Sequence, residues 1–291
     1  MKSRLAFMAS LGFSYMEPEE VVRILSQIGY EGVEWTLAHL DPRKRPLKEI
    51  ERVVYLTHEY NMEISEVVVQ QDLVSLDEKV RKERIEFVLM CIDIFSEVGI
   101  KTINLFTGPA PWDKKAPRIP VDISEGKAWD MVFEAYEKFV HKAEVKRMNL
   151  AVEGVWGMLC HDYYTTKTLI DRFNSPYLGV NFDPSHDILA GNLDVGWIIK
   201  QWGRRIKHIH LKDAVGIQKE GKFIFPLLGE GNVDWKSFFS ALDEINYQGF
   251  MSVEFESFTY YHQVLKGNVE ESARISMENI ERLFSGKSNL G

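Results

Sequence analysis

The chain alternates short β-rich segments with longer amphipathic segments, and this alternation repeats eight times. The β-rich segments cover residues 5–12, 32–35, 64–69, 102–106, 150–155, 178–183, 206–213 and 250–257. Segments with helical periodicity follow them at residues 17–29, 47–60, 77–98, 124–148, 163–173, 195–201, 234–245 and 269–284. Eight such units predict an α/β fold, a (β/α)₈ barrel in a single domain over residues 1–291. An open doubly wound sheet is the less favoured alternative.

Composition argues against several classes of partner. With 43 acidic and 35 basic side chains the formal charge is −8, which repels phosphate backbones, so we expect no nucleic acid partner. No apolar run approaches the ~18 residues of a membrane span, and the N-terminal segment lacks a convincing cleavage site. Cys91 and Cys160 are too few for a disulfide framework. We therefore expect a cytoplasmic protein without membrane contact.

Ionisable side chains fall at the C-terminal ends of the last four predicted strands, where barrel enzymes place their sites. The fifth to eighth strands supply Glu153, Asp183, His210 and Glu254, with Glu256 following on the eighth. Carboxylates buried together repel one another unless a cation is present. Three carboxylates and one imidazole favour Mn²⁺, with Mg²⁺, Co²⁺ and Zn²⁺ as alternatives.

Structural roles are the alternative for each of these residues taken singly. Asp183 precedes Pro184 and could simply cap the next helix. His208 and His210 are two residues apart on a predicted strand and therefore share a face. That face is either packed core, where both imidazoles need partners, or the wall of a polar cavity that binds a metal.

Five motifs carry a resemblance to a known family. VEGVWG, NFDPSHDILAG, HIHLKDA, LGEGNVDW and SVEFES, in this order, resemble the xylose isomerase-like TIM-barrel family of the sugar phosphate isomerase and epimerase superfamily. Matched motif by motif, the implied metal ligands are Glu153, Asp183, His210 and Glu254. The resemblance also implies that His186 contacts the substrate. His208 would lie one layer deeper, as a supporting or substrate-facing group.

The resemblance implies a metal-dependent sugar isomerase or epimerase. Glu153 and Glu254 are the implied catalytic residues, which move a proton next to a carbonyl through an enediolate. Glu256 is either a further proton carrier or an orienting partner. The alternative is a metal-dependent lyase or dehydratase on a keto-sugar, an inosose or a 3-keto-glycoside, including a C-glycoside deglycosidase with a small partner subunit.

Other classes fit the sequence less well. Apurinic endonucleases share the barrel but need more than the eight histidines present here and a basic groove. Amidohydrolases carry His-x-His on the first strand, where this chain has none. A sugar-binding barrel without catalysis would not need the four ligand positions.

Loops after the strands supply further candidates for substrate contact. Residues 107–126 carry four of the ten prolines and form either a lid or a structural loop. His161 and His39 are candidate auxiliary bases. Tryptophans near strand ends either stack on a sugar or aglycone or pack in the core, and these are Trp35, Trp112 and Trp156.

The HLKDA motif and its surroundings bear on substrate and assembly. Lys212 either pairs with a substrate hydroxylate or extends to solvent, and extension to solvent is the favoured expectation. Asp213, just past the strand, is a candidate for orienting an imidazole. Gly216 stands where the resembling ketose 3-epimerases carry an arginine, and no phosphate cradle of standard spacing is present. These features favour a small unphosphorylated sugar or glycoside. A homo-oligomer and a small partner subunit both remain compatible with the sequence.

Overall fold

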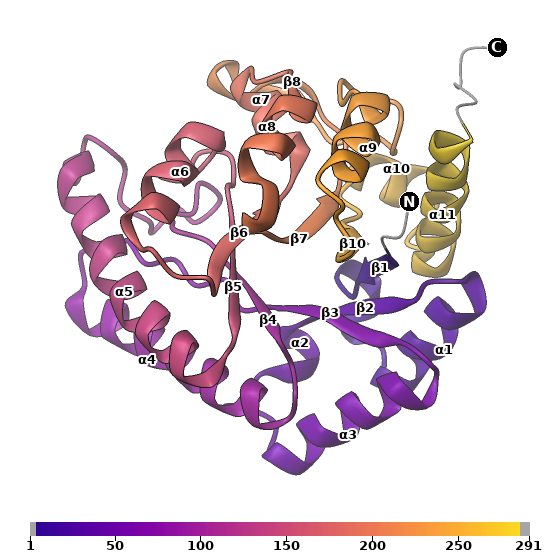
Figure 1. Cartoon of the computed structure of the whole chain (residues 1–291), viewed down its shortest axis with the longest axis horizontal. Coiled ribbons are helices and arrows are strands. Elements are labelled where there is room, and N and C mark those ends of the chain that lie inside the picture. Colours follow the sequence, from indigo (N-terminus) through magenta and orange to yellow (C-terminus); the bar gives the residue numbers. More distant parts are fainter. Residues whose placement is uncertain (1–3, 286–291) are drawn as a thin grey trace.

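Eight parallel strands close into a barrel in the computed structural model, which describes residues 4–285 (Figure 1). The strands are β1 (Arg4–Met8), β2 (Gly32–Thr36), β3 (Glu63–Val68), β4 (Thr102–Leu105), β5 (Asn149–Glu153), β6 (Leu178–Phe182), β7 (Ile206–Leu211) and β10 (Phe250–Val253). Each strand pairs with its neighbours in the chain order of the barrel, and β10 closes the ring on β1. The predicted (β/α)₈ barrel is confirmed.

Helices surround the barrel, and every predicted helical segment is present (Figure 1). They are α1 (Pro18–Ile28), α3 (Leu47–Glu59), α4 (Glu78–Glu97), α5 (Glu125–Lys146), α6 (Tyr163–Arg172), α8 (Val195–Trp202), α9 (Trp235–Glu244) and α11 (Val269–Phe284). Their limits follow local signals. In α1, Pro18 occupies the first turn and Gly29 ends the helix in a left-handed conformation (φ 110°), which glycine adopts without strain.

The loops at the strand ends contain further elements, of which the sequence indicated only a helix after Asp183. Three short helices are α2 (Leu37–Leu40), α7 (Pro184–Ala190) and α10 (Phe258–Gln263), and a hairpin joins β8 (Val215–Ile217) to β9 (Lys222–Ile224). The first predicted strand was too long, because η1 (Leu11–Tyr15) is a 3₁₀ helix. Pairing of β1 with β2 ends at Met8, so the apolar residues after it pack without continuing the sheet.

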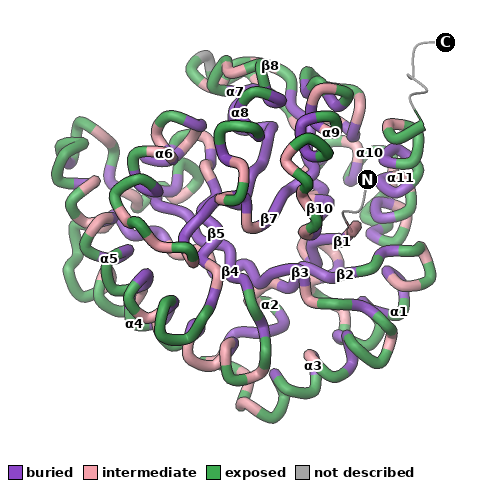
Figure 2. The backbone as a smooth tube through the Cα atoms, viewed as in Figure 1, coloured by how far each residue is buried: buried purple, intermediate pink, exposed green. Residues whose placement is uncertain are grey.

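Burial divides the molecule into a polar barrel interior and an apolar shell. The strands are buried along most of their length, whereas the helices expose their outer faces (Figure 2). Apolar side chains fill the space between strands and helices, including Phe139 and Phe238, which are fully buried. Trp35 belongs to this shell, where its indole N–H donates to Thr57 Oγ1 at 3.1 Å. It is therefore a packing residue, and the stacking role considered for it is wrong.

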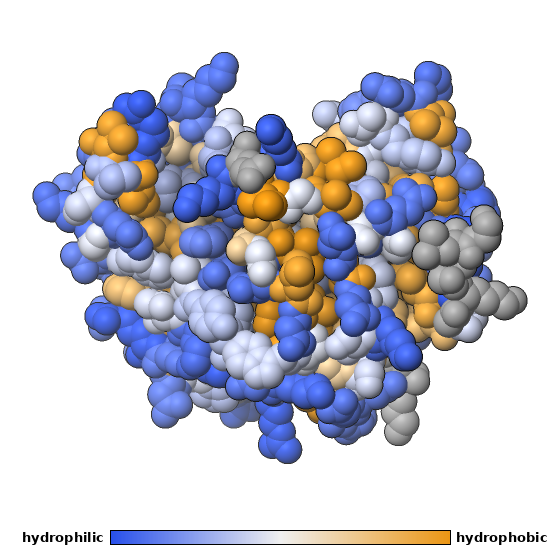
Figure 3. All heavy atoms as spheres, turned by 90° about the horizontal axis from the view of Figure 1, so that it is seen from above, coloured by the Kyte–Doolittle hydropathy of each residue, from blue (hydrophilic) through white to orange (hydrophobic). Residues whose placement is uncertain are grey.

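Seen from above the view of Figure 1, the outer surface is mostly hydrophilic, with hydrophobic side chains gathered near the middle and a hollow in the upper edge (Figure 3). Among the described residues, none of the helices has the length and apolar character needed to cross a membrane.

Helix α7 follows β6 beside the site described below, and hydrogen bonds to Asp187 fix its position. The Asp187 carboxylate accepts hydrogen bonds from the backbone N–H of Tyr163 at 2.9 Å and from Asn192 Nδ2 at 3.1 Å. Burial raises the pKa of Asp187 from 3.8 to about 7. Protonation of Asp187 therefore persists to higher pH in the folded protein than in the unfolded chain.

Close approach of strands explains one glycine in the barrel wall. A Cβ atom on Gly179 of β6 would lie 2.0 Å from the Arg205 carbonyl oxygen, whereas one on Gly126 of α5 would have no neighbour within 4 Å. We expect Gly179→Ala to lower the free energy of unfolding by ~1–3 kcal/mol. The matched variant Gly126→Ala should be neutral or stabilising by up to ~1 kcal/mol. Urea denaturation measures both, and equal stabilities would contradict the close approach.

The raised pKa of Asp187 predicts a pH-dependent contribution to stability. Because the folded-state pKa lies above the unfolded value, this contribution is fully present below pH 3.8 and is lost as the pH rises through about 7. Asp187→Asn keeps an acceptor oxygen but does not titrate. We expect the variant to gain stability relative to the unsubstituted protein between about pH 4 and about pH 7. Denaturation series across this range test it, and a constant difference would refute it.

Candidate metal and substrate site

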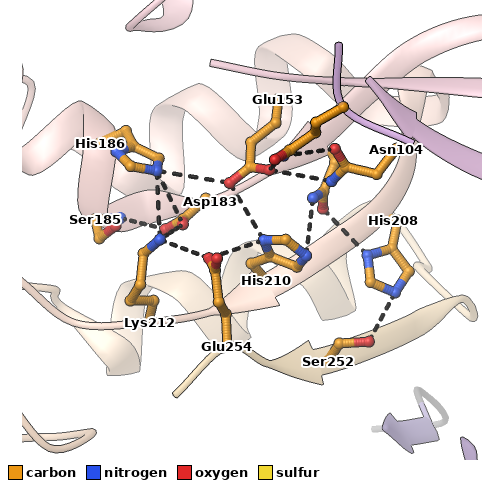
Figure 4. Close-up of polar contacts among 12 residues, drawn as sticks. Asn104, Glu153, Asp183, Ser185, His186, His208, His210, Lys212, Ser252 and Glu254 are labelled. Atoms are coloured by element: carbon orange, nitrogen blue, oxygen red, sulfur yellow. Dashed lines mark hydrogen bonds and ion pairs between the residues drawn. The ribbon is translucent and has the colours of Figure 1, made fainter. Parts of the chain in front are cut away.

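Four side chains converge at the C-terminal end of the barrel (Figure 4). Glu153 is the last residue of β5, Asp183 follows β6, His210 lies in β7, and Glu254 follows β10. One ligand atom from each lies within 4.8 Å of those of the other three. These are the four residues that the sequence predicted as ligands, and the barrel places them together.

Asp183 combines the two roles that its sequence position allowed. Its Oδ1 accepts a hydrogen bond from the Ser185 backbone N–H at 2.8 Å and so caps α7. Its Oδ2 points the other way, to Lys212 Nζ at 2.8 Å and His186 Nε2 at 3.4 Å. Capping the helix therefore orients this carboxylate and leaves one oxygen for the cluster.

Opposite charges hold the cluster together. His210 Nδ1 lies 3.3 Å from Glu153 Oε1 and 3.2 Å from Glu254 Oε2. Burial alone would lower the pKa of His210, but Glu34, Glu153 and Glu254 raise it well above its usual value. Burial would raise the pKa of Glu254, yet Lys212 and His210 bring it down to about 2. Without another cation, the imidazolium and the ammonium are the positive charges that compensate these carboxylates.

Lys212 is buried, so the expectation that it extends to solvent was wrong. Its side chain is 3% exposed, and Nζ lies 2.5 Å from Glu254 Oε2 and 3.1 Å from Glu256 Oε2. Burial acts to lower the pKa of Lys212, but Asp183, Glu254 and Glu256 raise it well above its usual value. The side chain points inward because its ammonium group compensates the charge of these buried carboxylates, which would be costly to bury unpaired.

Asp213 organises a loop and does not orient an imidazole, which corrects a second expectation. Its carboxylate accepts backbone hydrogen bonds from Gly229 at 3.0 Å, Gly231 at 3.1 Å and Val233 at 3.1 Å, and one from Trp235 Nε1 at 2.9 Å. The LGEGNVDW motif therefore wraps around this buried carboxylate.

A deeper polar group lies beneath the four converging residues, and only its two histidines were among the candidates predicted from the sequence. Glu34 and Glu66 approach His208 and His210 to form a second set of four potential ligands. His210 Nε2 lies 2.9 Å from Glu34 Oε1, and His208 Nδ1 lies 3.1 Å from Glu66 Oε1. Burial raises the pKa of Glu66 to about 8 and lowers that of His208 to about 3. A lone glutamate inside each apolar segment, GVEW and ISEVVV, was the available signal.

Amide side chains join the two layers. Asn104 Nδ2 donates to Glu66 Oε1 at 3.1 Å and to Glu153 Oε2 at 3.1 Å. Gln70 Nε2 donates to Glu153 Oε2 at 2.7 Å. Because these donors occupy Oε2, the other Glu153 oxygen is the one directed at His210 and His186.

A cavity of about 460 Å³ opens above the cluster. It is lined by Met8, Ser10, Leu11, Gln70, Trp112, Glu153, Val155, Trp156, His186, Lys212, Phe225, Glu254, Phe255, Glu256 and Phe258. The predicted substrate contacts His186, Glu256 and Trp112 are among these residues. Their roles stay predictions, but the structure places all three on the surface that a substrate above the cluster would touch.

The other candidates for substrate contact or base catalysis lie elsewhere. His208 is 1% exposed and sits in the deeper layer, where Nε2 contacts Ser252 Oγ at 2.9 Å (Figure 4). His161 lines a separate cavity of about 450 Å³ beside the 107–126 loop. His39 is buried, with Nε2 3.1 Å from the Phe13 carbonyl oxygen.

The donors of the upper cluster suit a divalent cation. Three carboxylate oxygens and one imidazole nitrogen converge, and Lys212 already contacts two of these carboxylates, which shows that positive charge is favoured there. Hard cations prefer such oxygen-rich donors, and Zn²⁺ accepts the same set.

Known proteins share this sequence pattern and fold. The sequence model of the family described as xylose isomerase-like TIM barrel matches residues 22–283. An inosose dehydratase from Clostridium perfringens is 28% identical over 144 residues, which cover 44% of this chain and 47% of that protein. A protein from Escherichia coli named "putative L-ribulose-5-phosphate 3-epimerase" is 29% identical over 182 residues, which cover 62% of this chain and 60% of that protein. The chain therefore spans about half to three fifths of these relatives' lengths.

A solved structure shows the same fold. The crystal structure of the IOLI protein with a bound zinc atom has a TM-score of 0.77 and 16% identity, and the match covers 99% of this chain and 100% of that one. With the family match over most of its length, the chain belongs to the xylose isomerase-like TIM-barrel family.

Proposed function

We propose that the protein is a divalent-metal-dependent isomerase or epimerase of keto-sugars. The observation that carries this proposal is the convergence of Glu153, Asp183, His210 and Glu254 within 4.8 Å at the floor of a cavity large enough for a sugar. The relatives are named for an inosose and for a ketose phosphate, and these names support a polyhydroxylated carbonyl compound as the class of substrate.

The proposed metal ligands are these four residues, and Mn²⁺ is the proposed cation because carboxylate oxygens predominate. A divalent cation held there supplies positive charge beside the substrate carbonyl, which makes the neighbouring C–H bond more acidic. Lys212 contacts two of the ligand carboxylates and would keep their charge compensated as a substrate enters.

Glu153 and Glu254 are the proposed proton carriers. The lowered pKa of each keeps it ionised, as a base must be before it removes a proton. The Glu254 side chain is 12% exposed and that of Glu153 is 2% exposed, so Glu254 is the more accessible from the cavity. One ionised carboxylate would take the α-proton to leave an enediolate and would itself become a carboxylic acid. That acid, or the second glutamate after it has taken the proton over, would return the proton to carbon, which restores the ionised pair.

Elimination of water is the second candidate, favoured by one contact in the site. Lys212 Nζ lies 3.4 Å from His186 Nε2, and both residues line the cavity. After a glutamate takes the α-proton, either nitrogen could protonate a departing hydroxyl group, which would leave as water. The 28% identity to an inosose dehydratase agrees with this branch.

Three broader features belong to the same proposal. The chain would act as one domain over residues 1–291, of which residues 1–3 and 286–291 lie outside the described part. It would work in the cytoplasm on a small sugar or glycoside. It would do so either as a homo-oligomer or with a small partner subunit.

The two histidines of β7 provide a test of the metal site. We expect the purified protein to bind about one divalent ion per chain. His210→Ala should abolish binding, because it removes a ligand, whereas His208→Ala should weaken affinity by no more than ~10–100-fold, the effect of an outer-shell partner. His58→Ala, on the exposed face of α3, is the control. Elemental analysis and metal titration measure occupancy, and equal loss in both β7 variants would instead implicate the deeper group.

The glutamate pair provides a test of the proton transfer. Glutamine keeps a carbonyl oxygen but cannot accept the α-proton. We expect Glu153→Gln or Glu254→Gln to slow α-proton exchange by ~10²–10⁴-fold, with metal content retained. Exchange is followed by NMR in D₂O, with Glu49→Gln on exposed α3 as the control. Near-normal exchange in both site variants would exclude the two-glutamate mechanism.

A further inference from the structure

The cavity above the cluster is polar at its floor and aromatic along its wall. Carboxylates and the Lys212 ammonium occupy the floor, beside His186. The apolar lining residues are Met8, Leu11, Trp112, Val155, Trp156, Phe225, Phe255 and Phe258. A ligand bound there would therefore meet two environments of different chemistry.

Separate loops contribute the aromatic wall. Trp112 belongs to the loop after β4, Trp156 follows β5, Phe225 follows β9, and Phe258 begins α10. The rings of Trp112 and Trp156 have centroids 6.0 Å apart, and Trp156 meets Phe223 edge to face at 4.9 Å. Ring contacts therefore run without a break from Trp112 through Trp156 and Phe223 to Phe225, and Phe258 lines the same cavity.

Two of these rings are left largely uncovered. Trp112 is 56% exposed and Phe258 is 44% exposed, although both line the cavity. Exposed aromatic side chains that gather at the mouth of a polar site are a common feature of ligand-binding surfaces. Burying them under a ligand would remove apolar surface from water, and an apolar group on the ligand is the partner that gains from this contact.

The charges in the cavity disfavour a phosphate group. Lys212 is the only lysine or arginine among the described residues that line it, and its ammonium is already engaged by Asp183, Glu254 and Glu256. Away from the proposed metal ligands, a phosphate dianion would therefore meet carboxylates and aromatic rings, with no free lysine or arginine among the described lining residues to bind it.

The β8–β9 hairpin adds to this bias. Gly216 has φ +114°, and a Cβ atom there would lie 2.1 Å from the Lys222 carbonyl oxygen, so the hairpin excludes a side chain at that position. The same hairpin leads into Phe225, which faces His186 at a centroid distance of 6.1 Å. On this side the described lining residues thus present the ring of Phe225, and no arginine is among them.

We propose that the substrate is an unphosphorylated keto-sugar joined to an apolar, aromatic aglycone. The sugar would lie on the carboxylate floor, and the aglycone would lie against Trp112, Trp156 and Phe258. The cavity volume of about 460 Å³ lies within the range of ~300–1,000 Å³ that is typical of sites for drug-sized ligands. This inference rests on the proposed function for the reaction, but the aglycone site can be tested by binding alone.

A matched pair of ligands tests the inference. The metal-loaded protein is titrated calorimetrically with phenyl and with methyl 3-keto-β-D-glucopyranoside, which differ only in the aglycone, and with D-fructose 6-phosphate. We expect the phenyl glycoside to bind ~10–100-fold more tightly than the methyl glycoside, the range given by burying one phenyl ring. The sugar phosphate should bind most weakly. Equal affinity for the two glycosides would overturn the inference. Tighter binding of D-fructose 6-phosphate than of either glycoside would also overturn it.

Variants locate the aglycone site. Trp112→Ala and, independently, Phe258→Ala should each reduce the ratio of phenyl to methyl affinity by ~3–10-fold, as loss of one aromatic contact predicts. Trp197→Ala is the matched control, because Trp197 is a partly exposed tryptophan on α8 that packs on Tyr163. An unchanged ratio in both site variants would contradict the placement.

Proton exchange separates this inference from the proposed function. In D₂O, a preserved phenyl preference without exchange at the carbon next to the carbonyl would refute the enolisation chemistry and keep the aglycone site. If the protein catalyses proton–deuterium exchange at the same rate in both glycosides and binds both with the same affinity, the enolisation chemistry is supported and the aglycone site is refuted.

Discussion

Burial of several carboxylates at one end of a closed barrel is the constraint on which the site depends. Glu153, Asp183 and Glu254 come from three different strands, and closure of the barrel brings them together. Removing each such ion from water costs several kcal/mol unless a partner of opposite charge is close. Lys212 and His210 meet this requirement in the protein itself. A divalent cation held by the same carboxylates would meet it as well.

This constraint extends below the cluster. The interior of a (β/α)₈ barrel is usually filled by branched apolar side chains, but here Glu34, Glu66 and His208 occupy the next layer. Their hydrogen bonds and opposite charges compensate the burial, and His210 contacts both layers through its two ring nitrogens. The apolar packing of the fold is therefore concentrated between strands and helices, while the barrel interior orients the site.

Strands and loops contribute different parts of the site. The polar groups of the floor lie on or directly after strands, where packing on all sides restricts their movement. The aromatic wall comes from loops, including Trp112 and Phe258, which stay partly exposed. In this arrangement the reaction would depend on the rigid floor, and the choice of substrate would depend on loop residues.

Local patterns in the sequence determined the eight strand and helix units, because periodicity and capping signals lie within each segment. They also determined the four converging residues, since the C-terminal ends of parallel strands meet at one edge of a barrel. Only the tertiary structure decided the direction of Lys212, the partners of Asp213, the placement of His161 on a separate cavity, and the deeper group. Glu34 contacts His210 across 176 residues of chain. Such a contact depends on the closure and register of the whole barrel, which no local segment encodes.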